Sequence, residues 1–444
     1  MSTFTKISLC SLLLILMANC TLTRQTTDDN DTYQPKSANE NKIMKPTLKT
    51  VSDSIYYDKV LGMLVGSSIG DALSSGIEMW PRNKIFAVYG NVEQLNRVNR
   101  RPSPEGTFKH IMQPGGTTDD TRWKQLTSEF LLTQDWNSIS SIDFAGFLVD
   151  YYLNTQVTLN SEDNTSHEPY EENYRDMMFL KEWVLVAKTY KDQLHESYRT
   201  ALDKFYGGEL TPAGMLYSPV FGIVYPKSPV DAYNLAFENA IFDHGYARDL
   251  TALVAAMVSE SFTSSITPNR MSYLLERVDP NGFFNSRLIG RTAHSIYVKA
   301  KEIVFESKTP IAIDSADTLK NPLMRFEWKN FSDQELIYMQ KAYELLDENN
   351  HEIQFNPREI FLIILTALEF CHYDFEKSLV FITNYGRDND TAGAIAGAIL
   401  GASVGYEGLP KEIKEQVLKA NVEDLNIDLR QIANDLVIHK NSMH

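Results

Sequence analysis

The sequence predicts an all-α globular domain, because many segments carry apolar residues at i, i+3 and i+4 spacing. Strictly alternating runs rich in Val, Ile and Thr, which would indicate strands, are scarce. Hydrophobic residues make up 43% of the 444 residues, which is enough to bury a sizeable core. The predicted helical segments are residues 56–73, 121–133, 144–153, 177–191, 230–242, 247–262, 334–346, 358–370, 375–383 and 391–405.

The first 52 residues are expected to lie outside this domain. An apolar run over residues 7–18 has the length of a signal peptide and is shorter than the ~20 residues that span a bilayer. It ends in Leu-Met-Ala-Asn-Cys, which is similar to a bacterial lipobox with Cys20 as the lipidated residue. We expect residues 1–19 to be a lipoprotein signal peptide and residues 20–52 a flexible polar tether. The alternatives are cleavage without lipidation, no cleavage, and an ordered arm in place of the tether.

These segments predict a membrane-anchored lipoprotein of the bacterial cell envelope, on its periplasmic or surface face. The chain has 42 Lys and Arg against 58 Asp and Glu, and this net charge of −16 argues against a nucleic-acid partner. Three cysteines exclude a disulfide-dense scaffold and a Cys-rich zinc module. Residues 53–444 should form the helical domain, with charged insertions on its surface near residues 160–200 and 300–350.

Two of the predicted helices have glycine at every fourth position, which places the glycines on one helix face. Each glycine inside a helix costs ~1 kcal/mol relative to alanine, so we expect a close helix contact to recover that cost. A transmembrane dimer motif is disfavoured, because the second run is only about 15 residues long and follows charged residues. The glycines are Gly62, Gly66 and Gly70 in the first helix and Gly393, Gly397, Gly401 and Gly405 in the second.

Two clusters of carboxylates and threonines immediately precede predicted helices, at residues 115–121 and 384–391. Helix capping alone would explain one carboxylate in each cluster. Two neighbouring carboxylates repel each other unless a cation lies between them. Because the clusters offer only hard oxygen ligands, they suit Mg²⁺, Mn²⁺ or Ca²⁺ and not zinc.

Three motifs in this order resemble the ADP-ribosylglycohydrolase family, including its dinitrogenase-reductase-activating glycohydrolase-like members. They are Gly-x-x-x-Gly-Asp-Ala-Leu at residues 66–73 followed by Glu78, Thr-Asp-Asp-Thr at residues 118–121, and Asn-x-Gly-x-Asp-x-Asp-Thr at residues 384–391. The resemblance runs from about residue 60 to residue 406. It implies a compact orthogonal all-α fold with a cleft that holds two metal ions, usually Mg²⁺, with Mn²⁺ as an alternative.

The resemblance also implies roles for individual residues. The metal ligands would be Thr118, Asp119, Asp120, Asp388, Asp390 and Thr391. We expect the catalytic residues, one of them a general base, to be Glu78, Asp119, Asp120 and Asp388. The expected substrate-binding residues are Tyr385, Gly386 and His244. The chain departs from the family at Arg387, where many members have glycine, and at Asn389, where threonine is usual.

The implied reaction is hydrolysis of the glycosidic bond of an ADP-ribosyl or related ribosyl conjugate, through an oxocarbenium-like transition state. The substrate would be an ADP-ribosylated protein or a small ADP-ribose-like molecule, and the attacking water would be activated at the dinuclear centre. Two alternatives remain open. A surface lipoprotein could bind the same ligand without turnover, and a metal-dependent phosphodiesterase or pyrophosphatase would yield AMP and ribose phosphate from ADP-ribose.

Overall fold

The computed structural model describes residues 53–100, 109–161, 178–263, 266–278, 290–309 and 321–443. The expected signal peptide, the tether and the lipidation site at Cys20 lie outside the described residues. Parts of the two charged stretches near residues 160–200 and 300–350 also lie outside them.

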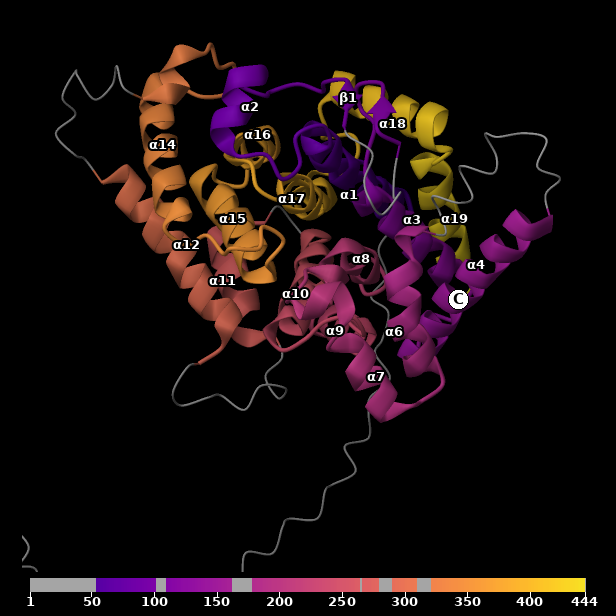
Figure 1. Ribbon diagram of the computed structural model, residues 1–444. Helices are drawn as coiled ribbons and strands as arrows, with labels where there is room; N and C mark the ends of the chain where they lie inside the picture. The colour runs from indigo at the N-terminus through magenta and orange to yellow at the C-terminus, as the bar shows by residue number, and fades with distance from the viewer. Residues whose placement is uncertain are drawn as a thin grey trace, which may run out of the picture. The chain divides into compact units, whose positions relative to one another are not determined.

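The described elements are helices apart from one short hairpin, which confirms the predicted all-α class (Figure 1). In chain order they are α1 (Asp53–Ser74), α2 (Arg82–Val88), β1 (Val98–Asn99), β2 (Ile111–Met112), α3 (Asp119–Leu132), α4 (Ser141–Ser161), α6 (Lys181–Lys191), α7 (His195–Leu202), η1 (Phe205–Gly208), α8 (Ala213–Gly222), α9 (Pro229–Asn239), α10 (Tyr246–Ser261), α11 (Pro268–Arg277), α12 (Thr292–Lys308), η2 (Pro322–Arg325), α14 (Asp333–Asp347), α15 (Pro357–Phe370), α16 (Phe375–Tyr385), α17 (Asn389–Val404), α18 (Lys411–Leu425) and α19 (Leu429–Ser442).

The two glycine-rich helices, α1 and α17, lie side by side in the interior, with α3, α8, α10 and α16 packed around them (Figure 1). A Cβ atom added at Gly62 would lie 2.5 Å from the carbonyl oxygen of Gly401. One added at Gly66 would be closer still to the carbonyl oxygen of Gly397. The expected close approach of the two backbones is therefore confirmed, and it leaves no room for a side chain at these positions.

The glycine pairs also fix the direction and register of the two helices. Gly70, near the end of α1, faces Gly393, near the start of α17. The helices are therefore antiparallel, and the C-terminal end of α1 meets the N-terminal end of α17. At the opposite end, the Lys59 ammonium donates to the carbonyl oxygens of Ala402 (2.9 Å) and Ser403 (3.1 Å). It thereby satisfies carbonyl groups that the last turn of α17 leaves unpaired.

Both charged stretches contribute buried side chains to the core instead of lying wholly on its surface. Trp183 of α6 packs against Trp123 of α3, with ring centroids 4.2 Å apart. Tyr343 of α14 is fully buried, and its hydroxyl donates to the carbonyl oxygen of Phe381 at 2.7 Å. Their aromatic residues therefore extend the same hydrophobic core as the glycine helices.

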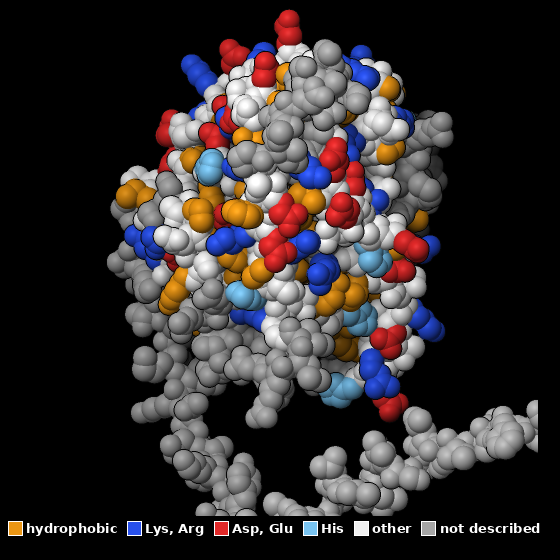
Figure 2. Space-filling view, turned by 90° about the vertical axis from the view of Figure 1, so that its left-hand side faces the viewer, with side chains coloured by type: hydrophobic (Ala, Val, Ile, Leu, Met, Phe, Trp, Pro, Cys, Tyr) orange, Lys and Arg blue, Asp and Glu red, His pale blue; other side chains and the backbone are white. Residues whose placement is uncertain are grey.

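The outer face that carries α12 and α14 shows acidic, basic and hydrophobic side chains intermingled (Figure 2). Among the described helices, none combines the length and the apolar character that crossing a bilayer would require.

Replacing Gly397 with alanine is predicted to destabilise the fold. The new methyl group would overlap the carbonyl oxygen of Gly66, so the helices must separate, at a cost of about 1–3 kcal/mol or more. Gly146 of α4 is the matched control, because a Cβ there would lie 3.8 Å from its nearest neighbour, Cε of Lys191. Gly146→Ala should be neutral or should stabilise by up to about 1 kcal/mol. Urea unfolding measures both free energies, and equal stabilities of the two variants would contradict the prediction.

Candidate active site

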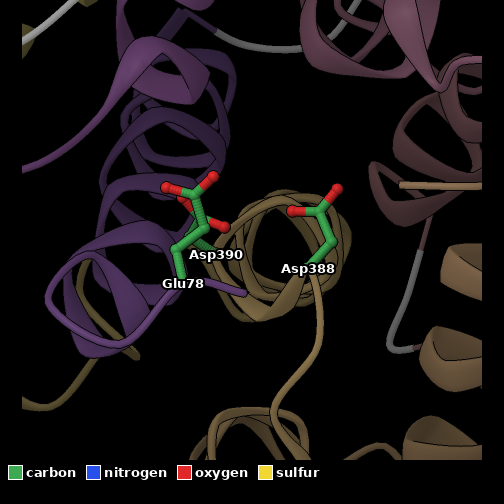
Figure 3. A group of neighbouring side chains, drawn as sticks. All are labelled: Glu78, Asp388 and Asp390. Atoms are coloured by element: carbon green, nitrogen blue, oxygen red, sulfur yellow. The ribbon is translucent and has the colours of Figure 1, made fainter. Parts of the chain in front are cut away.

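Three carboxylates meet where the end of α1 reaches the start of α17. Glu78 lies in the turn that follows α1, and Asp388 and Asp390 lie at the N-terminus of α17. One oxygen atom from each carboxylate lies within 4.8 Å of the other two. All three carboxylates point to the same side of α17 (Figure 3). The antiparallel register of the glycine helices therefore brings together residues that are more than 300 positions apart in the sequence.

Two oxygen atoms of this cluster have no hydrogen-bond partner among the described residues. They are Oδ1 of Asp388 and Oδ1 of Asp390, and these side chains are only 3% and 2% exposed. Oδ2 of Asp390 accepts a hydrogen bond from the hydroxyl of Thr118 at 3.3 Å. A buried carboxylate oxygen without a partner is costly, and a hard cation would satisfy it. The donor set therefore fits Mg²⁺ or Mn²⁺.

Burial and mutual repulsion disfavour the charged forms of these acids. Burial raises the pKa of Asp388 well above its usual range, and the nearby Glu78 carboxylate raises it further. The same two causes raise the pKa of Asp390. Burial and the neighbouring Asp120 raise the pKa of Asp119 to about 7. A bound cation would reverse this balance by stabilising the carboxylates.

Asp120 differs from the other acids, because both of its oxygens already have partners. Oδ1 accepts a hydrogen bond from the Lys124 ammonium at 3.1 Å, and Oδ2 accepts one from the hydroxyl of Thr391 at 3.0 Å. Both Asp120 and Lys124 are buried. Asp120 thus ties the start of α3 to the start of α17, directly behind the cluster.

The start of α3 is held by a carboxylate from another helix. The capping position, Thr118, makes no side-chain hydrogen bond to the first turn. Instead, Asp71 of α1 accepts hydrogen bonds from the backbone N–H groups of Thr118 (3.0 Å) and Thr121 (3.2 Å) and from the Thr121 hydroxyl (2.7 Å). Burial and the charge of Asp120 raise the pKa of Asp71 to about 8. The cap of α3 is therefore supplied by Asp71 of the first sequence motif and not by the residues directly before the helix.

The carboxylates form one wall of a cavity with a volume of about 260 Å³. Asp119, Thr391 and the three clustered acids line this wall, and Arg100 lies beside them. The remaining lining residues are mostly apolar or aromatic and come from the turn after α1, α6, η1, α8, the segment before α8 and the loop before α15. They are Met79, Trp183, Tyr206, Thr211, Pro212, Ala213, Leu216 and Phe355. The cavity therefore combines a polar end with an aromatic end, as ligand sites commonly do.

Arg100, Tyr206 and Phe355 were not identified from the sequence. Arg100 directly follows strand β1, and its guanidinium forms an ion pair with the carboxylate of Glu78. Its backbone N–H donates to the carbonyl oxygen of His110 at 2.7 Å, which extends the antiparallel hairpin. Strands of two residues leave no periodic signal in the sequence, so no local pattern marked this position.

Two of the expected substrate-binding residues do not line the cavity. The hydroxyl of Tyr385 donates to a side-chain oxygen of Asn350 at 2.8 Å, and its ring is buried. Gly386 has φ of 88° and forms a backbone bridge to Pro81. A Cβ atom at Gly386 would lie 2.5 Å from the carbonyl oxygen of Trp80. Both residues thus shape the loop that leads into α17.

The third expected residue, His244, does not line the cavity either. Its Nε2 shares a hydrogen bond with the carbonyl oxygen of Leu202 at 2.8 Å. The adjacent Asp243 accepts hydrogen bonds from the backbone N–H of Gly214 (2.9 Å) and the hydroxyl of Thr251 (2.6 Å). Burial raises the pKa of Asp243 to about 6. This segment therefore fixes the start of α8, a helix that lines the cavity.

Arg387, which departs from the family pattern, connects the cluster to the aromatic end. Its φ of 68° is unusual for a residue with a side chain. Nε of Arg387 donates to Oε1 of buried Glu359 at 2.6 Å, and its Nη2 donates to the carbonyl oxygen of His351. The backbone N–H of His351 donates to Oε2 of the same Glu359 at 2.6 Å. These hydrogen bonds among Arg387, Glu359 and His351 hold the loop before α15, which carries Phe355, next to the start of α17.

A family model described as ADP-ribosylglycohydrolase matches residues 52–442. Among solved structures, 43 chains match, including one titled "ADP-ribosylglycohydrolase-related protein complex". That structure has 16% sequence identity and a TM-score of 0.50, and the match covers 88% of this chain and 99% of the other. It supports the helical fold alone. No curated protein matches the chain by sequence.

Stabilisation by Mg²⁺ is predicted to be larger at pH 8 than at pH 5. The raised pKa values of Asp119, Asp388 and Asp390 mean that these acids hold protons at pH 5, and protons compete with a cation. Without the cation, stability should fall as the pH rises from about 4 through 7, because the folded protein binds protons that the unfolded chain releases. At about 100 times Kd, the gain from Mg²⁺ should be about 2.7 kcal/mol. Melting curves with Mg²⁺ or EDTA at both pH values test this, and equal shifts would contradict it.

Proposed function

Because this chain belongs to the ADP-ribosylglycohydrolase family and is thus a hydrolase of glycosidic bonds, we propose that it cleaves ADP-ribosyl conjugates with the help of Mg²⁺. The observation that carries the proposal is the pair of buried carboxylate oxygens on Asp388 and Asp390, which have no partner in the described part of the chain and lie beside Glu78 in the cavity. Such oxygens fit a hard divalent cation, and the adjoining cavity fits part of a nucleotide conjugate.

Two Mg²⁺ ions, or Mn²⁺ in their place, are proposed for the carboxylate wall. The residues that would hold them are Glu78, Thr118, Asp119, Asp388, Asp390 and Thr391, while Asp120 is already bonded to Lys124 and Thr391 and supports them from behind. When bound, such ions would hold the ribose hydroxyls and lower the pKa of a water molecule.

Glu78 and Asp119 are the best placed acids for proton transfer. Both line the cavity and are partly exposed, whereas Asp120, Asp388 and Asp390 are buried. A carboxylate that accepts a proton from water assists attack on the ribose carbon, where an oxocarbenium-like charge develops. The acids around it would also stabilise that positive charge.

The rest of the cavity suits the nucleotide part of the substrate. The N-termini of α3 and α17 lie at the carboxylate wall, and helix N-termini favour anions such as a diphosphate. At the other end, the ring centroids of Tyr206 and Phe355 lie 6.3 Å apart, and those of Tyr206 and Trp183 are also 6.3 Å apart. These rings offer faces and edges against which a base could pack.

Envelope localisation and a lipid anchor at Cys20 are part of the same proposal, and they rest on the sequence of residues 1–52. An ADP-ribosylated protein or a small ADP-ribose-like molecule would then meet the domain at the membrane surface. The signal-like sequence supports that location through its charge, length and terminal cysteine.

The full-length protein is predicted to release free ADP-ribose in the presence of Mg²⁺. Arginine-linked, serine-linked and O-acetyl conjugates would be incubated with Mg²⁺ or with EDTA, and the products identified by mass spectrometry. Release from any one conjugate, abolished by EDTA, is the expected result. Release of AMP and ribose phosphate would instead identify a phosphodiesterase or pyrophosphatase, and stoichiometric binding without product would identify a binding protein.

Replacing Asp390 with asparagine is predicted to abolish Mg²⁺-dependent turnover without unfolding the protein. Activity should fall more than about 100-fold, since loss of even an outer partner of a metal ligand costs about 10–100-fold. Asp150→Asn on α4 is the matched control, because the Asp150 side chain is 65% exposed and does not line the cavity. Wild-type turnover in Asp390→Asn would refute the assignment.

Replacing Phe355 with alanine is predicted to raise KM more than it lowers kcat. Loss of an aromatic contact to a base should raise KM roughly 5- to 100-fold, while the carboxylate wall stays intact. Phe355→Tyr keeps the ring and should behave like the wild type. Steady-state kinetics on the conjugate that is cleaved distinguishes the two constants, and an unchanged KM in Phe355→Ala would exclude this contact.

A further inference from the structure

Arg100 is the one cationic side chain among the described residues that line the cavity. It lies at the end of strand β1, in a hairpin separate from the helices that carry the acids. Its guanidinium pairs with Glu78, and the two side chains are 16% and 19% exposed. Burial alone would lower the pKa of Arg100, but Glu78, Asp390 and Asp119 together raise it. Arg100 is therefore a fixed positive charge that faces acids from both α3 and α17.

Glu78 has two competing partners in this arrangement. One of its oxygens belongs to the cluster within 4.8 Å of Asp388 and Asp390, the site proposed for a cation. Its Oε2 is held by the guanidinium of Arg100. A guanidinium next to a divalent cation is repelled, and a carboxylate oxygen shared between the two binds each less strongly. The ion pair and a bound cation therefore oppose each other at Glu78.

The second cation near the cluster, Lys124, does not compete in this way. It lies on the same helix as its partner Asp120, one turn away, and both are at most 2% exposed. The other oxygen of Asp120 is bonded to the Thr391 hydroxyl. Lys124 is therefore a fixed part of the wall, whereas Arg100 approaches from a separate hairpin and contacts a partly exposed acid.

We propose that Arg100 is a positioning residue that holds Glu78 in the cation-free site and competes with the divalent cation for that carboxylate. The inference rests on the proposed cation site. Arg100 keeps the carboxylate of Glu78 at the cavity wall, close to Asp390, while no cation is bound. It also makes cation binding weaker than the acids alone would give, so a higher cation concentration is needed to fill the site.

The test measures Mn²⁺ affinity of the full-length protein by isothermal titration calorimetry. Arg100→Gln removes both the competitor for Glu78 and the repelling charge, so Kd should fall on the order of tenfold. Arg100→Lys keeps the charge but loses the planar fork, and its Kd should lie between those of the wild type and Arg100→Gln. In a Glu78→Gln background, Arg100→Gln should have a clearly smaller effect, because the contested carboxylate is gone.

The outcomes separate this inference from the proposed function. Unchanged or weaker Mn²⁺ binding in Arg100→Gln, with an unchanged melting temperature in EDTA, overturns the competition and leaves the cation site standing. The inference is also overturned if Arg100→Gln lowers the Kd for Mn²⁺ equally in the wild-type and Glu78→Gln backgrounds. Arg100 would then act only through its charge and not through Glu78. If no protein binds Mn²⁺, both proposals fail. Should Arg100→Gln not fold, Arg100→Lys decides alone, and an unchanged Kd there overturns the inference.

Discussion

The backbone contact between α1 and α17 is the constraint on which the site depends. A Cβ atom at Gly62 would lie 2.5 Å from the carbonyl oxygen of Gly401, so the two helices approach as closely as backbones allow. Such a contact tolerates neither a larger residue nor a shift along the axis, because each glycine faces one glycine of the partner. The contact therefore fixes where the end of α1 lies relative to the start of α17, and so the distance from Glu78 to Asp390.

This placement costs free energy, because it brings several carboxylates close together where they are buried from water. Their raised pKa values express the cost. The fold lowers it in two ways, through the buried Lys124 beside Asp120 and through the Arg100 guanidinium beside Glu78. Neither cation bonds to Oδ1 of Asp388 or Oδ1 of Asp390, which have no partner among the residues that the structure describes. The proposed divalent cation would balance the charge that remains, because hard carboxylate oxygens suit Mg²⁺ or Mn²⁺.

The all-α class, the two glycine helices and the acidic residues could be predicted from the sequence. Several other helices, among them α8, α12, α18 and α19, and much of the surroundings of the acids were not predicted. Helical periodicity reports burial of one face, and the motifs around residues 118–121 and 384–391 are local patterns. Arg100 directly follows a two-residue strand and Phe355 lies in a loop, where no period exists to detect. Tyr385 was expected to bind substrate because it lies in the third motif, but neighbours in sequence can point to opposite sides of a loop. Its hydroxyl is instead bonded to Asn350 behind that loop.

The division of the cavity into two ends explains why the motifs indicate the reaction better than the substrate. The acids lie on α3, α17 and the turn after α1, which the glycine contact fixes. The aromatic end comes from α6, η1 and the loop before α15, including a stretch that had the composition of an insertion. Arg387 joins the two ends through Glu359, because that one carboxylate also binds the backbone of the Phe355 loop. A change in the aromatic end could therefore alter which ligand the cavity accepts while the acids stay in place. Arg387 is the residue through which such a change would reach the start of α17.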